Sequence, residues 1–159
     1  MAEIIVREGQ LDFPVLNSNF EARVRASFEK QLVMGTFGAE MNAVEPGFVR
    51  LSLPFGTHLT QQHGFLHGGV VAAMLDSACG YAAMTLMPED AEVLTVEFKT
   101  NFLSPAAGEM FTFEGRVLKP GRTLIVAEGE ARADKLIAKM TATLMVVQGR
   151  ADVSPQTGT

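Results

Sequence analysis

Residues 69–84 read GVVAAMLDSACGYAAM, a stretch rich in the helix formers Ala, Leu and Met. The stretch is apolar almost all round, and the loop residues Pro88 and Asp90 follow it. A helix that is apolar on every side has to be buried. We therefore expect a buried helix here, enclosed by the rest of the chain.

On the C-terminal side of this helix, apolar and polar residues alternate along the chain, as they do in β-strands. We expect a half-buried strand at 93–103 and further strands at 110–118, 123–132 and 136–147, forming an antiparallel meander. The separator Lys119-Pro120-Gly121-Arg122 suits a type II turn, with Gly121 at the position of positive φ. The first strand should place Leu94, Val96, Phe98 and Phe102 on its apolar face and Thr95, Glu97, Lys99 and Asn101 on its polar face.

On the N-terminal side, residues 19–33 have apolar positions at helical spacing, which predicts an amphipathic helix. Residues 36–54 contain two apolar runs around Glu45-Pro46-Gly47, which predicts two strands joined by a turn. Two strands, a buried helix and then about four strands indicate an α+β fold. In it, a curved antiparallel sheet wraps the long central helix.

Length and composition indicate one domain, because 159 residues of which 47% are hydrophobic can bury a substantial core. We expect a single domain over 1–159, with its core at about 36–147 and a frayed polar tail at 151–159. The net charge of −5 argues against nucleic acid as a partner, since that binding needs many Lys and Arg. A single cysteine, with no signal segment and no purely apolar span, indicates a cytoplasmic protein that does not enter a membrane.

Glycines and polar groups gather at the start of the buried helix and within it. Gly68 and Gly69 stand at its start, where free N–H groups can bind an anion or a developing oxyanion. Asp76 is one carboxylate among apolar and small residues, and burying an unpaired charge is costly. Burial should raise its pKa while nearby donors lower it, as in a general base or nucleophile. The alternative is that Asp76 only caps or pairs with a structural group.

His67 is the second candidate beside this helix. Nine residues separate it from Asp76, which on a helix means opposite sides and about 13 Å along the axis. If both residues serve one active site, they have to come from different helices, so we expect the site at a subunit interface. The alternative is a histidine whose ring bonds only to the backbone at the helix start.

Other chemistries fit the sequence less well. His58, His63 and His67 have no acidic or cysteine ligand at a familiar spacing, which argues against a metal site. Cys79 is flanked by Ala and Gly within the buried helix, so we interpret it as a packing residue and not a nucleophile. Dinucleotide-binding, P-loop and serine-hydrolase motifs are absent. The turn at 119–123 carries two cations and a hydroxyl, which suit phosphate groups but also an ordinary solvated turn.

Taken together, these residues resemble the hotdog-fold thioesterases of the phenylacetate-degradation and 4-hydroxybenzoyl-CoA type. The similarity covers about residues 36–147. Three segments carry the similarity; none of them is specific alone, but their order and spacing together are specific. The segments are Gly64-x-x-His67-Gly68-Gly69 with an acid nine residues after the histidine, Thr95-Val96-Glu97-Phe98 leading to Asn101-Phe102-Leu103-Ser104-Pro105, and Leu118-Lys119-Pro120-Gly121-Arg122.

For the catalytic residues, the resemblance implies an acyl-CoA thioester hydrolase. Asp76 would act as base or nucleophile, and the Gly68 N–H would polarise the carbonyl oxygen. His67 would support this by hydrogen bonding. Gln61, where many relatives carry Asn, would help to place substrate or water, and Thr95 would orient the attacking water.

For ligands and assembly, the resemblance implies that Lys119, Gly121, Arg122 and Asn101 hold the nucleotide part of CoA. No cofactor is implied beyond the CoA of the substrate. The family joins the sheets of two subunits, and homotetramers are common in it.

The acyl pocket is expected to be apolar, and the residues that could line it are Phe65, Met74, Tyr81 and Met84. A non-catalytic acyl-CoA binding module of the same fold is the alternative function. A hydratase fits less well, because its acid and histidine have a different spacing. Release of free thiol from an acyl-CoA separates the enzyme from the binding module.

Overall fold

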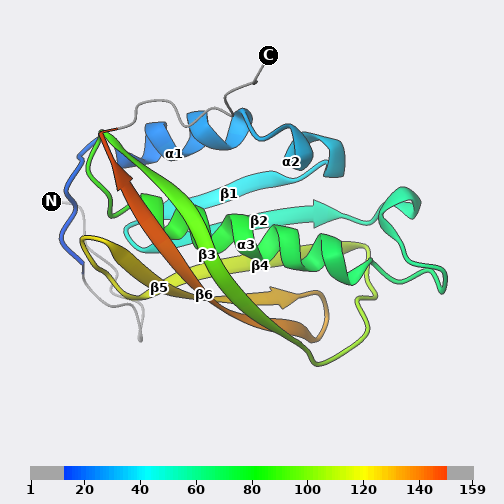
Figure 1. Ribbon diagram of the computed structural model, residues 1–159. Coiled ribbons are helices and arrows are strands. Elements are labelled where there is room, and N and C mark those ends of the chain that lie inside the picture. The colour runs from blue at the N-terminus through cyan, green and yellow to red at the C-terminus, as the bar shows by residue number, and fades with distance from the viewer. Residues whose placement is uncertain (1–12, 150–159) are drawn as a thin grey trace, which may run out of the picture.

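The computed structural model describes residues 13–149, and Figure 1 shows a curved antiparallel sheet wrapped around one long helix. The expected α+β hotdog architecture is confirmed. The predicted tail at 151–159 lies outside the described residues. The elements are α1 (Phe20–Glu29), α2 (Leu32–Phe37), β1 (Glu40–Glu45), β2 (Phe48–Pro54), the 3-10 turn η1 (Thr57–Leu59), α3 (Gly68–Met84), β3 (Ala91–Phe102), β4 (Met110–Lys119), β5 (Leu124–Arg132) and β6 (Leu136–Gln148).

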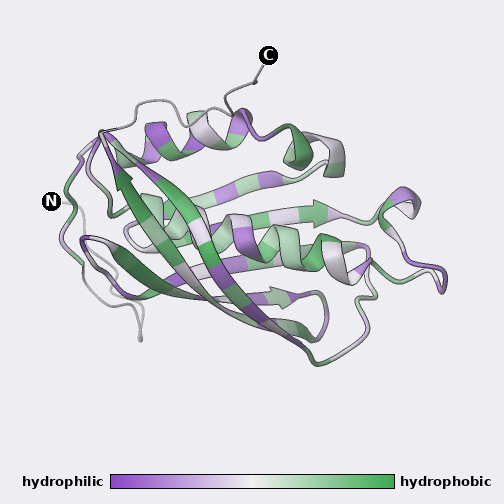
Figure 2. Cartoon of the chain, in the orientation of Figure 1, coloured by the Kyte–Doolittle hydropathy of each residue, from purple (hydrophilic) through white to green (hydrophobic). Residues whose placement is uncertain are grey.

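The sheet has the strand order β1-β2-β4-β5-β6-β3, with every neighbouring pair antiparallel. β1 and β3 are therefore its edges. The helix α3 packs on the concave face, where alternate residues of β4, β5 and β6 are buried. The residues of α3 are hydrophobic along most of the helix (Figure 2). The buried helix predicted from composition is thus confirmed.

The centre of α3 lies almost directly on the sheet backbone. Gly115 of β4 and Gly129 of β5 are paired beneath it. A Cβ at Gly115 would lie 2.2 Å from the carbonyl oxygen of Ala78, and one at Gly129 would lie 3.1 Å from Cys79 Sγ. At Gly115 no side chain separates helix from sheet, so α3 rests there on the backbone of β4 two residues beyond Asp76.

The N-terminal segment differs from the prediction at the C-terminal end of the expected helix. Residues 19–33 do not form one helix, because Gln31 is extended between α1 and α2. Thr36 and Phe37 belong to α2 and not to a strand. The helix ends there because Gly38 takes the left-handed conformation with φ +77°, which glycine adopts at little cost.

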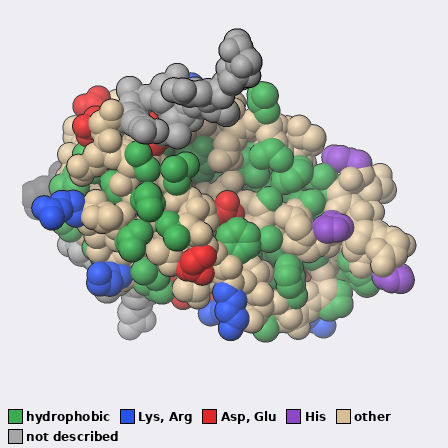
Figure 3. All heavy atoms as spheres, viewed as in Figure 1, with side chains coloured by type: hydrophobic (Ala, Val, Ile, Leu, Met, Phe, Trp, Pro, Cys, Tyr) green, Lys and Arg blue, Asp and Glu red, His purple; other side chains and the backbone are tan. Residues whose placement is uncertain are grey.

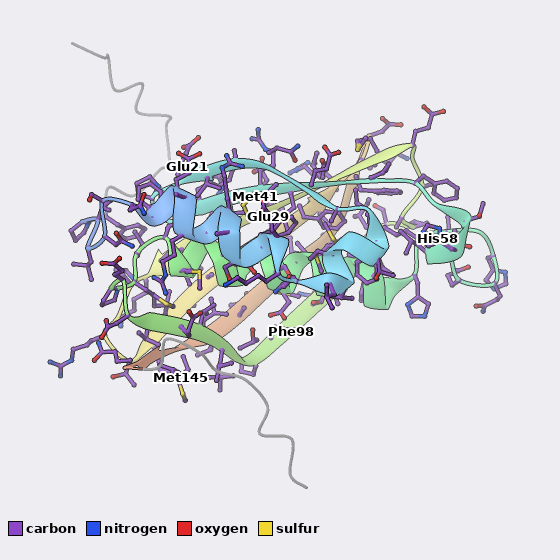
Figure 4. All side chains as sticks on the ribbon, turned by 90° about the horizontal axis from the view of Figure 1, so that it is seen from above. Glu21, Glu29, Met41, His58, Phe98 and Met145 are labelled. Atoms are coloured by element: carbon purple, nitrogen blue, oxygen red, sulfur yellow. The ribbon has the colours of Figure 1, made fainter. Side chains whose placement is uncertain are left out.

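The edge strand β3 is exposed, whereas a half-buried strand was predicted. Leu94, Val96, Phe98 and Phe102 are each between 43% and 55% exposed. The burial prediction is wrong for this chain because β3 has no further strand beside it within residues 13–149. Seen from above, Phe98 lies on β3 beyond the helices, and Met145 of β6 points outward (Figure 4).

A bulge in β3 also changes which side chains face the helix. The pairing with β6 shifts between Thr95 and Glu97. Thr95 is opposite the buried Leu144, and Phe98 is opposite the buried Ala142, so both face α3. The predicted separation of Thr95 and Phe98 onto opposite faces is therefore wrong, since one extra residue reverses the alternation.

The turn between β4 and β5 needs glycine for a different reason from the predicted one. Gly121 does not have positive φ, so the type II assignment is wrong. A Cβ at this position would lie 2.0 Å from the carbonyl oxygen of Leu124. Close backbone approach, not a left-handed conformation, therefore selects Gly121.

Candidate active site

Asp76 lies in the middle of α3, half-buried, and points toward β3. The hydroxyl of Thr95 donates a hydrogen bond of 2.7 Å to Asp76 Oδ1. The bulge in β3 turns Thr95 toward the helix, which is a known use of bulges beside active sites. The structure thus brings together two of the predicted catalytic residues.

Burial raises the pKa of the Asp76 carboxyl, and the hydrogen bond from Thr95 partly offsets this by lowering it. The raised pKa follows because a desolvated carboxylate is costly in its charged form. A carboxylate in this state takes up a proton more readily than one in water. It therefore has the balance of effects expected for a general base.

A cavity of about 290 Å³ opens beside Asp76. Its wall on α3 contains Ser77, Gly80, Tyr81 and Met84. Its other walls come from β3 and from the end of α1. The residues on those walls are Ser27, Lys30, Gln31, Glu92, Val93 and Thr95.

Gly68 begins α3, and its N–H is the free donor at that end. His67 precedes it, and His67 Nδ1 accepts a 2.8 Å hydrogen bond from the Gly69 N–H. The carbonyl of His67 accepts from Val70 and Val71. Within residues 13–149 the Gly68 N–H donates to no protein group. An acceptor from a ligand can therefore reach it.

The His67 ring is exposed, and in the described part of the chain it bonds only to the backbone of Gly69. This is the structural alternative considered above for this residue. Gln61 lies nearby in the loop before α3, where its side-chain oxygen accepts from the His63 N–H. Gln61 and Gly68 line the same open groove of about 440 Å³, together with Phe65 and Phe102.

The two halves of the predicted site do not meet within one chain. Asp76 and Gly68 are eight residues apart on α3, which is about 12 Å along the helix axis. They also line different cavities. In Figure 3 the histidine side chains gather at one end of the molecule, apart from acidic atoms near the centre of this face.

The predicted CoA-binding residues are likewise separated. Gly121 and Arg122 line an apolar cavity of about 300 Å³ near the C-terminal end of α3. Leu124, beside this turn, pairs with Met145 of β6, and Met145 pairs in turn with Leu94 of β3. Asn101 pairs with Lys139, farther along β6. Seven residues of β3 therefore separate Asn101 from the turn, which is about 23 Å. Lys119 and Arg122 form no ion pair with any residue from 13 to 149.

Two other chemistries can be judged from the same region. Cys79 is completely buried, and burial raises the pKa of its thiol to about 12, so it cannot supply a thiolate. No group of three His, Cys, Asp or Glu residues between 13 and 149 could hold a metal ion. None of the helices in that range is long and apolar enough to cross a membrane.

Sequence reasoning missed part of the lining of the Asp76 cavity. Tyr81 and Met84 line it, but Phe65 lies in the other groove and Met74 is completely buried in the core. Ser27, Gln31 and Ser77 were not singled out. The polar Gln31 at the end of an amphipathic stretch was the available signal, but it indicated a surface position equally well.

Comparisons with known proteins agree with the fold described above. Residues 63–138 match the sequence profile of the Thioesterase superfamily. A presumed esterase of Saccharolobus solfataricus is 35% identical over 116 residues, covering 73% of this chain and 75% of that protein. The medium/long-chain acyl-CoA thioesterase YigI of Escherichia coli K12 is 28% identical, covering 69% of this chain and 81% of YigI. The crystal structure of a thioesterase family protein from Silicibacter pomeroyi is 56% identical with a TM-score of 0.81, covering 82% of this chain and 99% of that one.

Proposed function

Because this chain belongs to the thioesterase superfamily, we propose that it hydrolyses an acyl-CoA to the free acid and CoA, with Asp76 as its catalytic carboxylate. The observation that carries the proposal is the half-buried Asp76 carboxylate, hydrogen-bonded by Thr95 beside a cavity. It supplies a group that can take a proton from water or attack a carbonyl carbon. The name of YigI supports CoA as the thiol half of the substrate.

The chemistry can follow either of two routes at Asp76. As a base, Asp76 removes a proton from water while the water oxygen bonds to the thioester carbon. As a nucleophile, it bonds to that carbon itself and forms a mixed anhydride, which water then hydrolyses. In both routes the Gly68 N–H stabilises the oxyanion, and the C–S bond breaks to release the CoA thiolate.

The remaining residues position the reacting groups. Thr95 holds the Asp76 carboxylate through its hydroxyl and can orient the attacking water. His67 bonds to the Gly69 N–H and so fixes the start of α3 that presents the Gly68 donor. Gln61 borders the same groove as Gly68 and can hydrogen-bond substrate or water.

We propose further that each active site is shared by two subunits. One thioester cannot touch both Asp76 and the Gly68 N–H of the same chain, since they lie about 12 Å apart along α3. Two residues of β3 lie next to these groups. Thr95 is hydrogen-bonded to Asp76, and the ring of Phe102 would lie 3.3 Å from a Cβ at Gly68. Both Thr95 and Phe102 are on the side of β3 that faces α3.

Pairing of two β3 edges brings the two halves together. In an antiparallel pairing about a two-fold axis near Lys99, Thr95 lies opposite Phe102 of the partner subunit. This register allows for the one extra residue of the bulge between Thr95 and Glu97. Asp76 of one subunit then faces Gly68 of the partner subunit. The pairing also gives hydrogen-bond partners to the unpaired backbone edge of β3.

The same arrangement accounts for the divided CoA site. Lys119 and Arg122 are cations without ion pairs in residues 13–149 and can bind the phosphates of CoA. Asn101 is about 23 Å from them on one chain, so it would have to act from the other subunit.

The first test is hydrolysis of acyl-CoA thioesters by the purified protein. We expect release of free thiol, followed with a chromogenic thiol reagent, from at least one member of a panel of aryl-, short- and medium-chain acyl-CoAs. Saturable binding of these thioesters without thiol release would instead support a non-catalytic binding module.

Activity should also fall at low pH because Asp76 has to be ionised. The pKa of Asp76 is raised above the value of about 3.9 for a free aspartate, so the acid limb of kcat/KM should lie above that pH. Thr95→Val removes the hydrogen bond that lowers this pKa, and we expect the limb to move to higher pH. The measurement is the pH profile of kcat/KM, with the exposed Thr141→Val as control. An unmoved limb would remove Thr95 from the role of tuning Asp76.

Mixed oligomers test the shared site. In a heterodimer of Asp76→Asn and Gly68→Pro subunits, one site carries both defects and the other carries neither. A random mixture should therefore regain about a quarter of the wild-type activity, because half of its dimers are mixed and each has one intact site of two. Refolding or coexpression of the two inactive variants gives the measurement. No recovery despite proven mixing would place both groups in one chain.

A further inference from the structure

The cavity beside Asp76 is polar, whereas an apolar acyl pocket was expected. Met84 and Val93 contribute apolar surface, but much of the remaining lining is hydroxyl, amide or charged. The polar residues come mainly from two places, the face of α3 next to Asp76 and the end of α1. This composition is informative about the group that the cavity takes.

Two hydrogen-bonded pairs form much of this polar lining. The Ser77 hydroxyl donates to Gln31 Oε1 at 3.0 Å, and Ser27 Oγ lies 3.3 Å from the Tyr81 hydroxyl. Each pair leaves hydrogen-bonding capacity unused. The Gln31 amide NH₂ donates to no residue between 13 and 149, and one of the Ser27 and Tyr81 hydroxyl hydrogens is also left over.

The acyl half of the substrate is the part that belongs in this cavity. Asp76 has to reach the thioester carbon or the water beside it, so the group bonded to that carbon lies within a few bonds of Asp76. The volume of about 290 Å³ equals that of about ten water molecules at ~30 Å³ each. The pantetheine arm and nucleotide are much larger and have to leave toward solvent, whereas a compact acyl group fits.

Charge in the lining favours a neutral acyl group. Two carboxylates, those of Glu92 and Asp76, belong to the lining. Glu92 Oε1 forms an ion pair of 3.8 Å with a guanidinium nitrogen of Arg23. Lys30 is the cation of the lining, and it is exposed. A carboxylate placed next to Asp76 would meet a like charge at close range, while a hydroxyl or carbonyl oxygen would not.

We infer that the preferred acyl group is compact and carries a neutral oxygen, which the Gln31 amide and the Ser27 and Tyr81 hydroxyls bind. This inference rests on the proposed thioesterase function and names a substrate class within it. It differs from the medium and long chains in the name of the relative YigI. An alkyl chain offers no acceptor to the unused Gln31 NH₂ or to the remaining hydroxyl hydrogen, which selects against it.

The test compares acyl-CoAs that differ only by one oxygen. Hexanoyl-CoA is paired with 3-hydroxy- and 5-hydroxyhexanoyl-CoA, and 3-phenylpropanoyl-CoA with its 4-hydroxyphenyl analogue. Dodecanoyl-CoA tests chain length, and the monothioester of a six-carbon dicarboxylic acid tests charge. For wild-type protein we expect kcat/KM to be at least about tenfold higher for the best hydroxylated member than for its parent.

Variants locate the selectivity. Gln31→Leu and the double variant Ser27→Ala, Tyr81→Phe should each lower this ratio severalfold, because each removes part of the set that binds the oxygen. The control is Gln62→Leu, an exposed glutamine outside the cavity, which should keep the wild-type ratio. A ratio of two rate constants on one preparation does not depend on the fraction of folded enzyme.

The possible results separate this inference from the function on which it rests. Equal rates within each pair, or fastest turnover of dodecanoyl-CoA or the dicarboxylic thioester, would overturn the inference and leave thioester hydrolysis standing. Selectivity retained in both sets of variants would overturn the assignment to Gln31, Ser27 and Tyr81. No hydrolysis of any member would overturn the proposed function itself.

Discussion

Replacing Asp76 by Asn is expected to lower kcat for thioester hydrolysis by about 10²–10⁴-fold, the range for loss of a general base. The amide keeps the size of the carboxylate and can still accept from Thr95, so the fold and the cavity should persist. The measurement is thiol release under saturating acyl-CoA, with binding of the thioester measured separately. Turnover within a few-fold of wild type would exclude Asp76 from the mechanism.

The same variant should be at least as stable as the wild type at neutral pH. Burial raises the pKa of Asp76 in the folded state, so the ionised carboxylate lowers the free energy of unfolding above that pKa. The cost disappears as the pH falls through the folded pKa toward the unfolded value. The difference in melting temperature between Asp76→Asn and wild type should therefore shrink on acidification.

A matched control for both measurements is Asp134→Asn. Asp134 is exposed in the turn between β5 and β6, where a carboxylate keeps its hydration. This change should leave both turnover and the melting temperature close to those of the wild type. A loss of stability in Asp76→Asn at neutral pH would show instead that the carboxylate has a structural role.

Gly68→Pro is expected to lower kcat by about 10²–10³-fold, as loss of one oxyanion-hole donor does in other enzymes. Proline removes the N–H and adds a ring, whose Cβ is also present in the alanine control below. Gly68 is the first residue of α3, where proline is well tolerated. His67 has φ −62° and ψ 136°, a conformation that a following proline favours.

Gly68→Ala is the control, because it adds a Cβ but keeps the N–H. That Cβ would lie 3.3 Å from the exposed ring of Phe102, which can move slightly. Alanine should therefore retain most of the turnover that proline loses. Equal losses in the two variants would attribute the effect to crowding of Phe102 and not to the missing donor.

Much of the architecture was predictable because it depends on local pattern. Residues 69–84 could only be a buried helix, since they have no polar face, and β4 to β6 follow from alternation and turn residues. Asp76 was conspicuous for the same reason, as a lone charge in an apolar helix. The predicted opposition of burial and hydrogen bonding at its carboxyl agrees with the structure.

Tertiary structure determined the features that depend on register and on contacts between distant segments. One extra residue in β3 turns Thr95 toward Asp76, and alternation alone predicted the opposite face for it relative to Phe98. Gln31 reaches Ser77 only because the chain breaks between α1 and α2 and places that junction over α3. Sequence periodicity reports which residues share a surface of one element. It does not report where a bulge shifts that surface or which remote side chains complete a cavity, because those depend on how the elements pack.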